Sequence, residues 1–80
     1  MKTVNVGMFG YGNVGEGVIQ YLNEFYDHEK TGTKINLKTI CVANPGKKRK
    51  HKLESALITD NPDDILNDDR IEVVVEAMGG

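Results

Sequence analysis

A glycine-rich stretch, GMFGYGNVGEGV, runs from residue 7 to residue 18 and holds five glycines among its twelve residues. The residues just before it, 4–9, are mostly apolar and indicate a short strand. From Val14 onward the apolar residues recur at helical spacing. A strand, a glycine turn and a helix therefore follow one another directly, and the fold must be built around that turn.

Six residues of this stretch, Gly10-Tyr11-Gly12-Asn13-Val14-Gly15, fit the pattern G-x-G-x-x-G. The pattern alone is weak, but between a strand and a helix it is typical of a dinucleotide-binding turn. In that mechanism Gly10 allows the tight turn, Gly12 lets a pyrophosphate approach the backbone, and Gly15 lets the helix pack closely on the strand. The N–H groups and the dipole at the helix start then hold the phosphates. The alternative is a glycine-rich turn without a ligand.

The helix after this turn is predicted to extend to residue 25 or 26. Its apolar face is formed by Val14, Val18, Leu22 and Phe25 or Tyr26. Gly17 lies in the helix interior, where it costs about 1 kcal/mol relative to alanine, so we expect it to serve close packing. The polar residues 27–32 then separate the helix from the next element.

The remaining elements follow from apolar runs and turn signals. We expect a strand over 35–42, a turn at 44–46, a basic loop over 47–52, a short strand over 57–59 and an apolar strand over 71–78. A short helix starts at Pro62, with Asp60 or Asn61 as its N-cap, and ends near residue 67. The element order is therefore β-α-β-β-α-β.

This order predicts an α/β fold of the Rossmann type, with a partial parallel sheet and right-handed crossovers. A parallel sheet needs cover on both faces, which two helices scarcely supply. The apolar run 71–78 has the character of a central strand, yet it lies at the end of the 80 residues. We therefore predict that residues 1–80 form one incomplete domain, the amino-terminal fragment of a doubly wound domain in a longer protein.

The end of the second strand determines which dinucleotide is favoured. An acidic residue there would bind the ribose hydroxyls of NAD and repel a 2′-phosphate, but this chain has Val42-Ala43-Asn44. Half of the ten lysines and arginines follow in the segment KKRKHK, which begins with Lys47, Lys48 and Arg49. Such side chains favour a phosphate dianion, so the sequence favours NADP, with NAD also possible. The alternative is that this loop is only a solvated surface.

Composition excludes several other classes of protein. The chain has 28% charged residues and a net charge of −2, which suits neither a disordered tail nor a nucleic-acid partner. No apolar run approaches a membrane span, and residues 1–2 lead directly into a strand, so we expect no membrane association and no secretory signal. The single cysteine, Cys41, fits a reducing cytoplasm, and we expect it to be a buried, inert thiol.

Other candidate side chains carry less chemistry. His28 and His51 lie far apart in polar segments, and the five aspartates between residues 60 and 69 suit a helix start and a turn, so we predict no metal site. Glu76 lies late in the last strand. It either faces the cofactor crevice or is a capped or solvent-facing carboxylate.

Three segments resemble the start of homoserine dehydrogenase: VGMFGYGNVGEGVIQYL, ICVANPGKKRK and DDILNDDRIEVVVEAMGG. The last of these is the most specific, because other dinucleotide enzymes seldom share the ending VVEAMGG. The resemblance implies the NAD(P)-dependent interconversion of L-homoserine and L-aspartate 4-semialdehyde, in the synthesis of threonine, methionine and isoleucine. It also implies a small-molecule substrate, and we expect the full-length enzyme to be a homo-oligomer.

The resemblance also implies roles for individual residues. The backbone around Tyr11, Asn13 and Val14 would meet the pyrophosphate, and Gly79 and Gly80 would lie near the nicotinamide. Family members often carry Arg-Asp where this chain has Ala43-Asn44, which would pass any contact with a 2′-phosphate to Lys47, Lys48 or Arg49. The family's catalytic lysine and its substrate-binding acidic residues lie beyond residue 80, so we predict no catalytic residue in this chain.

Two functions remain compatible with these observations. The chain is either the nucleotide-binding part of a homoserine dehydrogenase, inactive by itself, or a stand-alone dinucleotide-binding or redox-sensing module without catalysis. An open reading frame that continues through a lysine-bearing catalytic domain would decide for the first.

Overall fold

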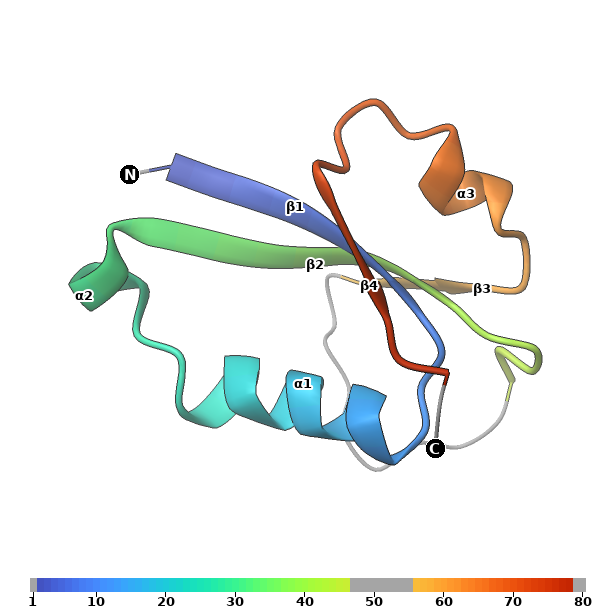
Figure 1. The fold of residues 1–80 in the computed structure, drawn as a ribbon, viewed down its shortest axis with the longest axis horizontal. Helices are drawn as coiled ribbons and strands as arrows, with labels where there is room; N and C mark the ends of the chain where they lie inside the picture. The colour runs from blue at the N-terminus through green and yellow to red at the C-terminus, as the bar shows by residue number, and fades with distance from the viewer. Residues whose placement is uncertain (1, 47–55, 79–80) are drawn as a thin grey trace.

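The computed structural model of the chain describes residues 2–46 and 56–78. Its elements follow the order expected from the sequence, with one additional short helix (Figure 1). They are β1 (Lys2–Phe9), α1 (Asn13–Glu24), α2 (His28–Thr31), β2 (Thr33–Cys41), β3 (Leu57–Thr59), α3 (Asp63–Leu66) and β4 (Val73–Glu76).

The four strands form one parallel sheet in the order β3-β2-β1-β4. This order confirms the predicted Rossmann-type α/β fold, because the chain moves outward through β2 and β3 and then crosses to the other side of β1. β1 and β2 pair along their whole length, with one shift of register between Val6 and Gly7. The carboxyl ends of β1, β2 and β3 therefore lie at one edge of the sheet.

The two crossover helices cover opposite faces of the sheet (Figure 1). Met8 of β1 faces α1, where its Cε lies 3.4 Å from the position of a Cβ built on Gly15. The neighbouring Gly7 faces α3, and a Cβ built on it would lie 2.7 Å from Cγ2 of Ile65. Because successive strand residues point to opposite faces, these two contacts place α1 and α3 on different sides of β1.

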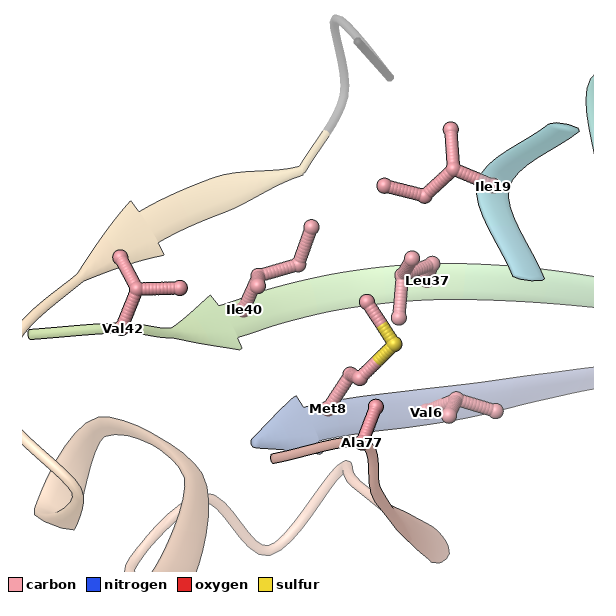
Figure 2. Packing of buried hydrophobic residues seen from close by; sticks show 7 residues of the cluster. All are labelled: Val6, Met8, Ile19, Leu37, Ile40, Val42 and Ala77. Carbon is pink, nitrogen blue, oxygen red and sulfur yellow. The ribbon is translucent and has the colours of Figure 1, made fainter. Parts of the chain in front are cut away.

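The core lies between α1 and the sheet. Side chains from β1, β2 and α1 meet there, together with Val42, which follows β2, and Ala77, which follows β4 (Figure 2). Met8, Ile19 and Ile40 are buried to within 1% of complete burial. The core is therefore built from the central strands and a single helix.

The buried face of α1 differs from the predicted one. Gly15 and Ile19 are its buried residues, whereas Val14 is 51% exposed and Phe25, the C-cap, is 65% exposed. The prediction was wrong for Val14, because it followed large apolar side chains, and of its two alternatives at the helix end Tyr26 is half-buried while Phe25 is exposed. The helix instead packs on the sheet through Gly15, which has no side chain, and the buried stripe continues one turn later at Ile19.

Some element boundaries also differ. β1 and β2 each begin two residues earlier than predicted, and β4 is shorter than 71–78, although Glu72 and Ala77 still donate backbone hydrogen bonds to β1. The polar segment 27–32 contains α2, which the sequence analysis did not predict. The helix α3 begins at Asp63, with Pro62 at its N-cap instead of Asp60 or Asn61, although the side chain of Asn61 accepts a hydrogen bond from the Asp63 N–H.

β4 forms one outer strand of the described sheet, and Val73 and Val74 are 45% and 50% exposed. Beside it, an apolar groove of about 390 Å³ lies between α1 and the sheet. Its walls include Tyr21 and Leu22 of α1 and Val73 and Val75 of β4. None of the helices in the described ranges has the length and apolar character needed to cross a membrane.

Candidate dinucleotide-binding site

A pocket of about 570 Å³ lies at the carboxyl ends of β1, β2 and β3. It is lined by three chain segments that are far apart in the sequence. These are residues 9–12 after β1, residues 41–44 at the end of β2, and Asp60 with Pro62 after β3; Met78 completes the lining. Ligands of open α/β sheets bind at this edge, so the pocket lies where the fold favours a site.

Gly10 makes the turn that begins this pocket. Its φ angle of +95° lies in the left-handed region, and its N–H donates a hydrogen bond of 2.8 Å to the carbonyl oxygen of Cys41. A Cβ at this position would also lie 2.8 Å from the backbone carbonyl of Ala77. The predicted role of Gly10 as a tight turn is therefore correct, and the glycine additionally lets the chain after β4 approach.

Gly15 has the close-packing role that the sequence predicted for it. A Cβ built there would lie 3.2 Å from the carbonyl oxygen of Gly10 and 3.4 Å from Cε of Met8. Gly17 does not have such a role: it is exposed, and a Cβ built on it meets no atom of the described chain within 4 Å. The prediction for Gly17 was wrong because its helical position faces away from the sheet.

Gly12 differs from both of its partners in the fingerprint. It is the N-cap of α1, has no side chain to cap the helix, and lines the pocket. Within the described residues, a Cβ built on Gly12 meets nothing within 4 Å, and its φ of −90° is open to any residue. Neither packing nor backbone geometry accounts for a glycine here, whereas a ligand that approaches the backbone would.

The structure brings two predicted regions into one site. Tyr11 and Gly12 after β1 and Ala43 and Asn44 after β2 line the same pocket. The remaining described residues of the fingerprint, Asn13, Val14 and Gly15, form the first turn of α1 just beyond the lining. Five other predicted site residues lie outside the described residues: Lys47, Lys48, Arg49, Gly79 and Gly80.

Sequence reasoning missed the contribution of the third strand. Asp60 and Pro62 line the pocket, and the side chain of Asp60 is the only one among the described lining residues that is charged at neutral pH. The signal was present, because parallel strands end at the same edge and Asp60 directly follows the strand 57–59, which was predicted with its observed bounds. In the sequence analysis, Asp60 is interpreted as part of a helix start and not as part of the pocket.

Cys41 lies on the floor of the pocket and is buried, as expected. Burial raises the pKa of its thiol, and the nearby negative charges of Asp60 and Asp64 raise it further. The predicted burial is therefore confirmed, and the raised pKa favours an inert thiol because the thiolate is the reactive form.

Among the described residues, Glu76 and His28 do not line the pocket. A carboxylate oxygen of Glu76 accepts a hydrogen bond from the Met78 N–H, which decides for the capped interpretation of this residue. His28 is exposed in α2, and His51 lies outside the described ranges. Across residues 2–46 and 56–78, no group of three or more His, Cys, Asp or Glu side chains is placed to hold a metal ion.

Comparison with known proteins identifies the family of this fold and pocket. A family model described as "Homoserine dehydrogenase, NAD binding domain" matches residues 10–80. The chain belongs to the homoserine dehydrogenase family. The matched region is the NAD-binding domain of that family, which indicates a nicotinamide dinucleotide as the cofactor.

Individual homoserine dehydrogenases match along the whole chain. The enzyme of Bacillus subtilis is 32% identical over 82 residues, which span 100% of this chain and 19% of the relative. The enzyme of Synechocystis is 32% identical over 98% of this chain and 18% of the relative. A crystal structure of S. aureus homoserine dehydrogenase at pH 8.5 superposes with a TM-score of 0.90 and 34% identity, over 100% of this chain and 21% of that one. The chain thus spans about a fifth of the length of these homoserine dehydrogenases.

Proposed function

We propose that this chain binds NAD(P) in the pocket at the carboxyl ends of β1, β2 and β3. The pyrophosphate contacts the backbone of residues 10–15, where Gly12 leaves open space and the first turn of α1 offers N–H donors. The adenosine half lies against Ala43 and Asn44, which line the same pocket after β2. Following the family resemblance, Gly79 and Gly80 lie near the nicotinamide.

The open space at Gly12 is the observation that carries this proposal. The protein's own packing explains the glycines at positions 10 and 15, but not the one at position 12. A bound pyrophosphate explains the glycine at position 12, because only a residue without a side chain lets the phosphate oxygens reach the backbone.

We further propose that NADP binds better than NAD, by about tenfold. The described end of β2 offers a neutral Asn44 in place of a carboxylate, and Lys47, Lys48 and Arg49 begin three residues after it in the sequence. Charge-assisted bonds to a 2′-phosphate are each worth about 1.5–3 kcal/mol when shielded, and solvent exposure reduces that. A tenfold preference corresponds to about 1.4 kcal/mol, which is slightly less than one such bond contributes.

For the full-length protein we propose the family's reaction, the interconversion of L-homoserine and L-aspartate 4-semialdehyde. The bound dinucleotide supplies or accepts the hydride, and the residues of this chain bind and orient it. Residues 1–80 then form the first part of the dinucleotide domain, with the substrate-binding and proton-transfer groups elsewhere in a homo-oligomeric cytoplasmic enzyme. The length of the relatives and the uncovered apolar groove beside β4 support this domain assignment.

The test of the pocket is the substitution Gly12→Val in the full-length protein. A branched side chain at this position fills the space that the pyrophosphate requires, so we expect NADPH affinity, measured by fluorescence titration, to fall by at least about tenfold. Gly17→Val is the matched control, because the same side chain there points into open space away from the pocket. Unchanged NADPH affinity in a folded Gly12→Val variant would refute the proposed site.

A further inference from the structure

The end of β3 contributes a negative charge to the dinucleotide pocket that the end of β2 lacks. Asp60 directly follows β3 and lines the pocket together with Gly12 and Asn44. In open α/β sheets that prefer NAD, a carboxylate at the end of the second strand binds the ribose and repels a 2′-phosphate. Here that position holds Asn44, and the carboxylate comes from the neighbouring parallel strand.

The carboxylate of Asp60 is available to a ligand. It is exposed, and it forms no hydrogen bond or ion pair with another described residue. The neighbouring polar side chains are occupied: the hydroxyl of Thr59 donates to Asp64, and the side chain of Asn61 accepts from the Asp63 N–H. Asp60 is thus the one acidic side chain of this turn that faces the pocket without a structural task.

The charge of Asp60 also reaches the floor of the pocket. The thiol of Cys41, at the end of β2, has its pKa raised first by burial and then by the charge of Asp60. Asp64 adds a smaller effect of the same sign, but it bonds Thr59 and does not line the pocket. Cys41 pairs with Thr59, the residue before Asp60, so Asp60 and Cys41 meet at the ends of β2 and β3, where the adenosine half of a dinucleotide is proposed to lie.

We propose that Asp60 is a specificity-determining residue that limits the preference of this protein for NADP over NAD. Its carboxylate disfavours a 2′-phosphate and accepts hydrogen bonds from a ribose that carries free hydroxyls. It thereby opposes Asn44 and the basic residues that follow Asn44, so both dinucleotides can bind. This role rests on the proposed dinucleotide site, and it assigns to β3 a discrimination that such folds usually place on β2.

The test compares Asp60→Asn with Asp69→Asn in the full-length protein. Both substitutions remove one negative charge, but Asp69 lies in the turn after α3, outside the pocket lining. Dissociation constants of NADH and NADPH are measured by fluorescence titration at low and at moderate salt. We expect Asp60→Asn to tighten NADPH about fivefold, with less effect on NADH and a smaller shift at higher salt, and Asp69→Asn to leave the ratio unchanged.

A second measurement reads the charge without a ligand. The pH dependence of alkylation of Cys41, followed by mass spectrometry of its peptide, should shift to lower pH in Asp60→Asn and not in Asp69→Asn. If Asp60→Asn binds both dinucleotides with the same affinity ratio as the unsubstituted protein, the specificity role of Asp60 is wrong and the proposed site still stands. A failure of the unsubstituted protein to bind either dinucleotide overturns the proposed site, and this role with it.

Discussion

The three glycines of the fingerprint are used in different ways. Gly10 is required by its positive φ and by the backbone of Ala77, and Gly15 by its approach to β1, whereas Gly12 is required by nothing in the described protein. A residue that packing does not need, at the lip of a pocket, points to a ligand more directly than the pattern itself does. Gly17 is also free of packing contacts, but only Gly12 combines open space around its Cβ position with a place in the pocket lining.

Asn44 offers a residue-scale prediction about cofactor choice. Asn44→Asp places a carboxylate beside the adenosine half, so it should weaken NADP more than NAD and lower the affinity ratio by about tenfold. Neutralising Lys47, Lys48 and Arg49 together should also weaken NADP selectively, because charge-assisted bonds to its phosphate are lost. The measurement is the ratio of the two dissociation constants at low and moderate salt. If the parent protein prefers NAD, or if neither change alters the affinity ratio, the basic segment is only a solvated surface.

The residues of the site were predictable to different degrees. Gly10 and Gly15 followed from the fingerprint because their roles depend on local backbone geometry. Asp60 was missed although it directly follows a predicted strand, because the pairing of β3 with β2 is what brings it into the same pocket as Asn44. The packing role predicted for Gly17 was wrong, because the face of the helix on which a residue lies depends on where the helix begins.

At the scale of elements, α1 shows that a glycine can lie on the buried face of a helix in place of a large apolar residue. The helix begins at Asn13 and packs on β1 through Gly15, whose lack of a side chain brings the two backbones together. Ile19, one turn later, is completely buried. A buried face that is predicted from large apolar residues alone omits Gly15 and includes Val14, which is exposed.

This difference gives a direct prediction for stability. Ile19→Ala should lower the free energy of unfolding by about 2–5 kcal/mol, because the side chain is fully buried and leaves a cavity. Val14→Ala should change it by no more than about 0.5 kcal/mol, because Val14 is 51% exposed. Urea denaturation of the two variants and the parent measures both values. Equal costs for the two substitutions would contradict the observed rotation of α1.

Element boundaries were less predictable than element types. The helix α2 has clear local signals: the side chain of Asp27 accepts hydrogen bonds from two N–H groups, and Gly32 ends the helix with a φ of +73°. It was missed because four residues without an apolar stripe give no periodicity to detect. β3, by contrast, was predicted with its observed bounds, because the turn-forming residues Asp60, Asn61 and Pro62 directly follow it.

At the scale of the whole molecule, the described residues leave apolar surface uncovered in one region. The outer strand β4 exposes Val73 and Val74, and the adjacent groove under α1 is lined by apolar side chains of both elements. Exposed apolar patches and unpaired strand edges favour association. The 80-residue chain alone is therefore expected to be poorly soluble, and a monodisperse monomer that unfolds cooperatively would contradict this.

The last prediction concerns the activity of residues 1–80 alone. Hydride transfer needs a positioned substrate and a group that exchanges its proton, in addition to the bound dinucleotide. Among the described residues of the pocket, only Asp60 is charged at neutral pH, and it lies between the ends of β2 and β3, where the adenosine half is proposed to bind. We therefore expect the purified 80-residue chain to show no homoserine-dependent reduction of NADP, while the full-length protein is active in the same absorbance assay.

A Gly12→Val version of the full-length protein serves as the control for contaminating dehydrogenases, because its activity should fall with its NADPH affinity. Homoserine-dependent reduction of NADP by a contaminant-free sample of the 80-residue chain would show that these residues hold catalytic groups that the described pocket does not reveal.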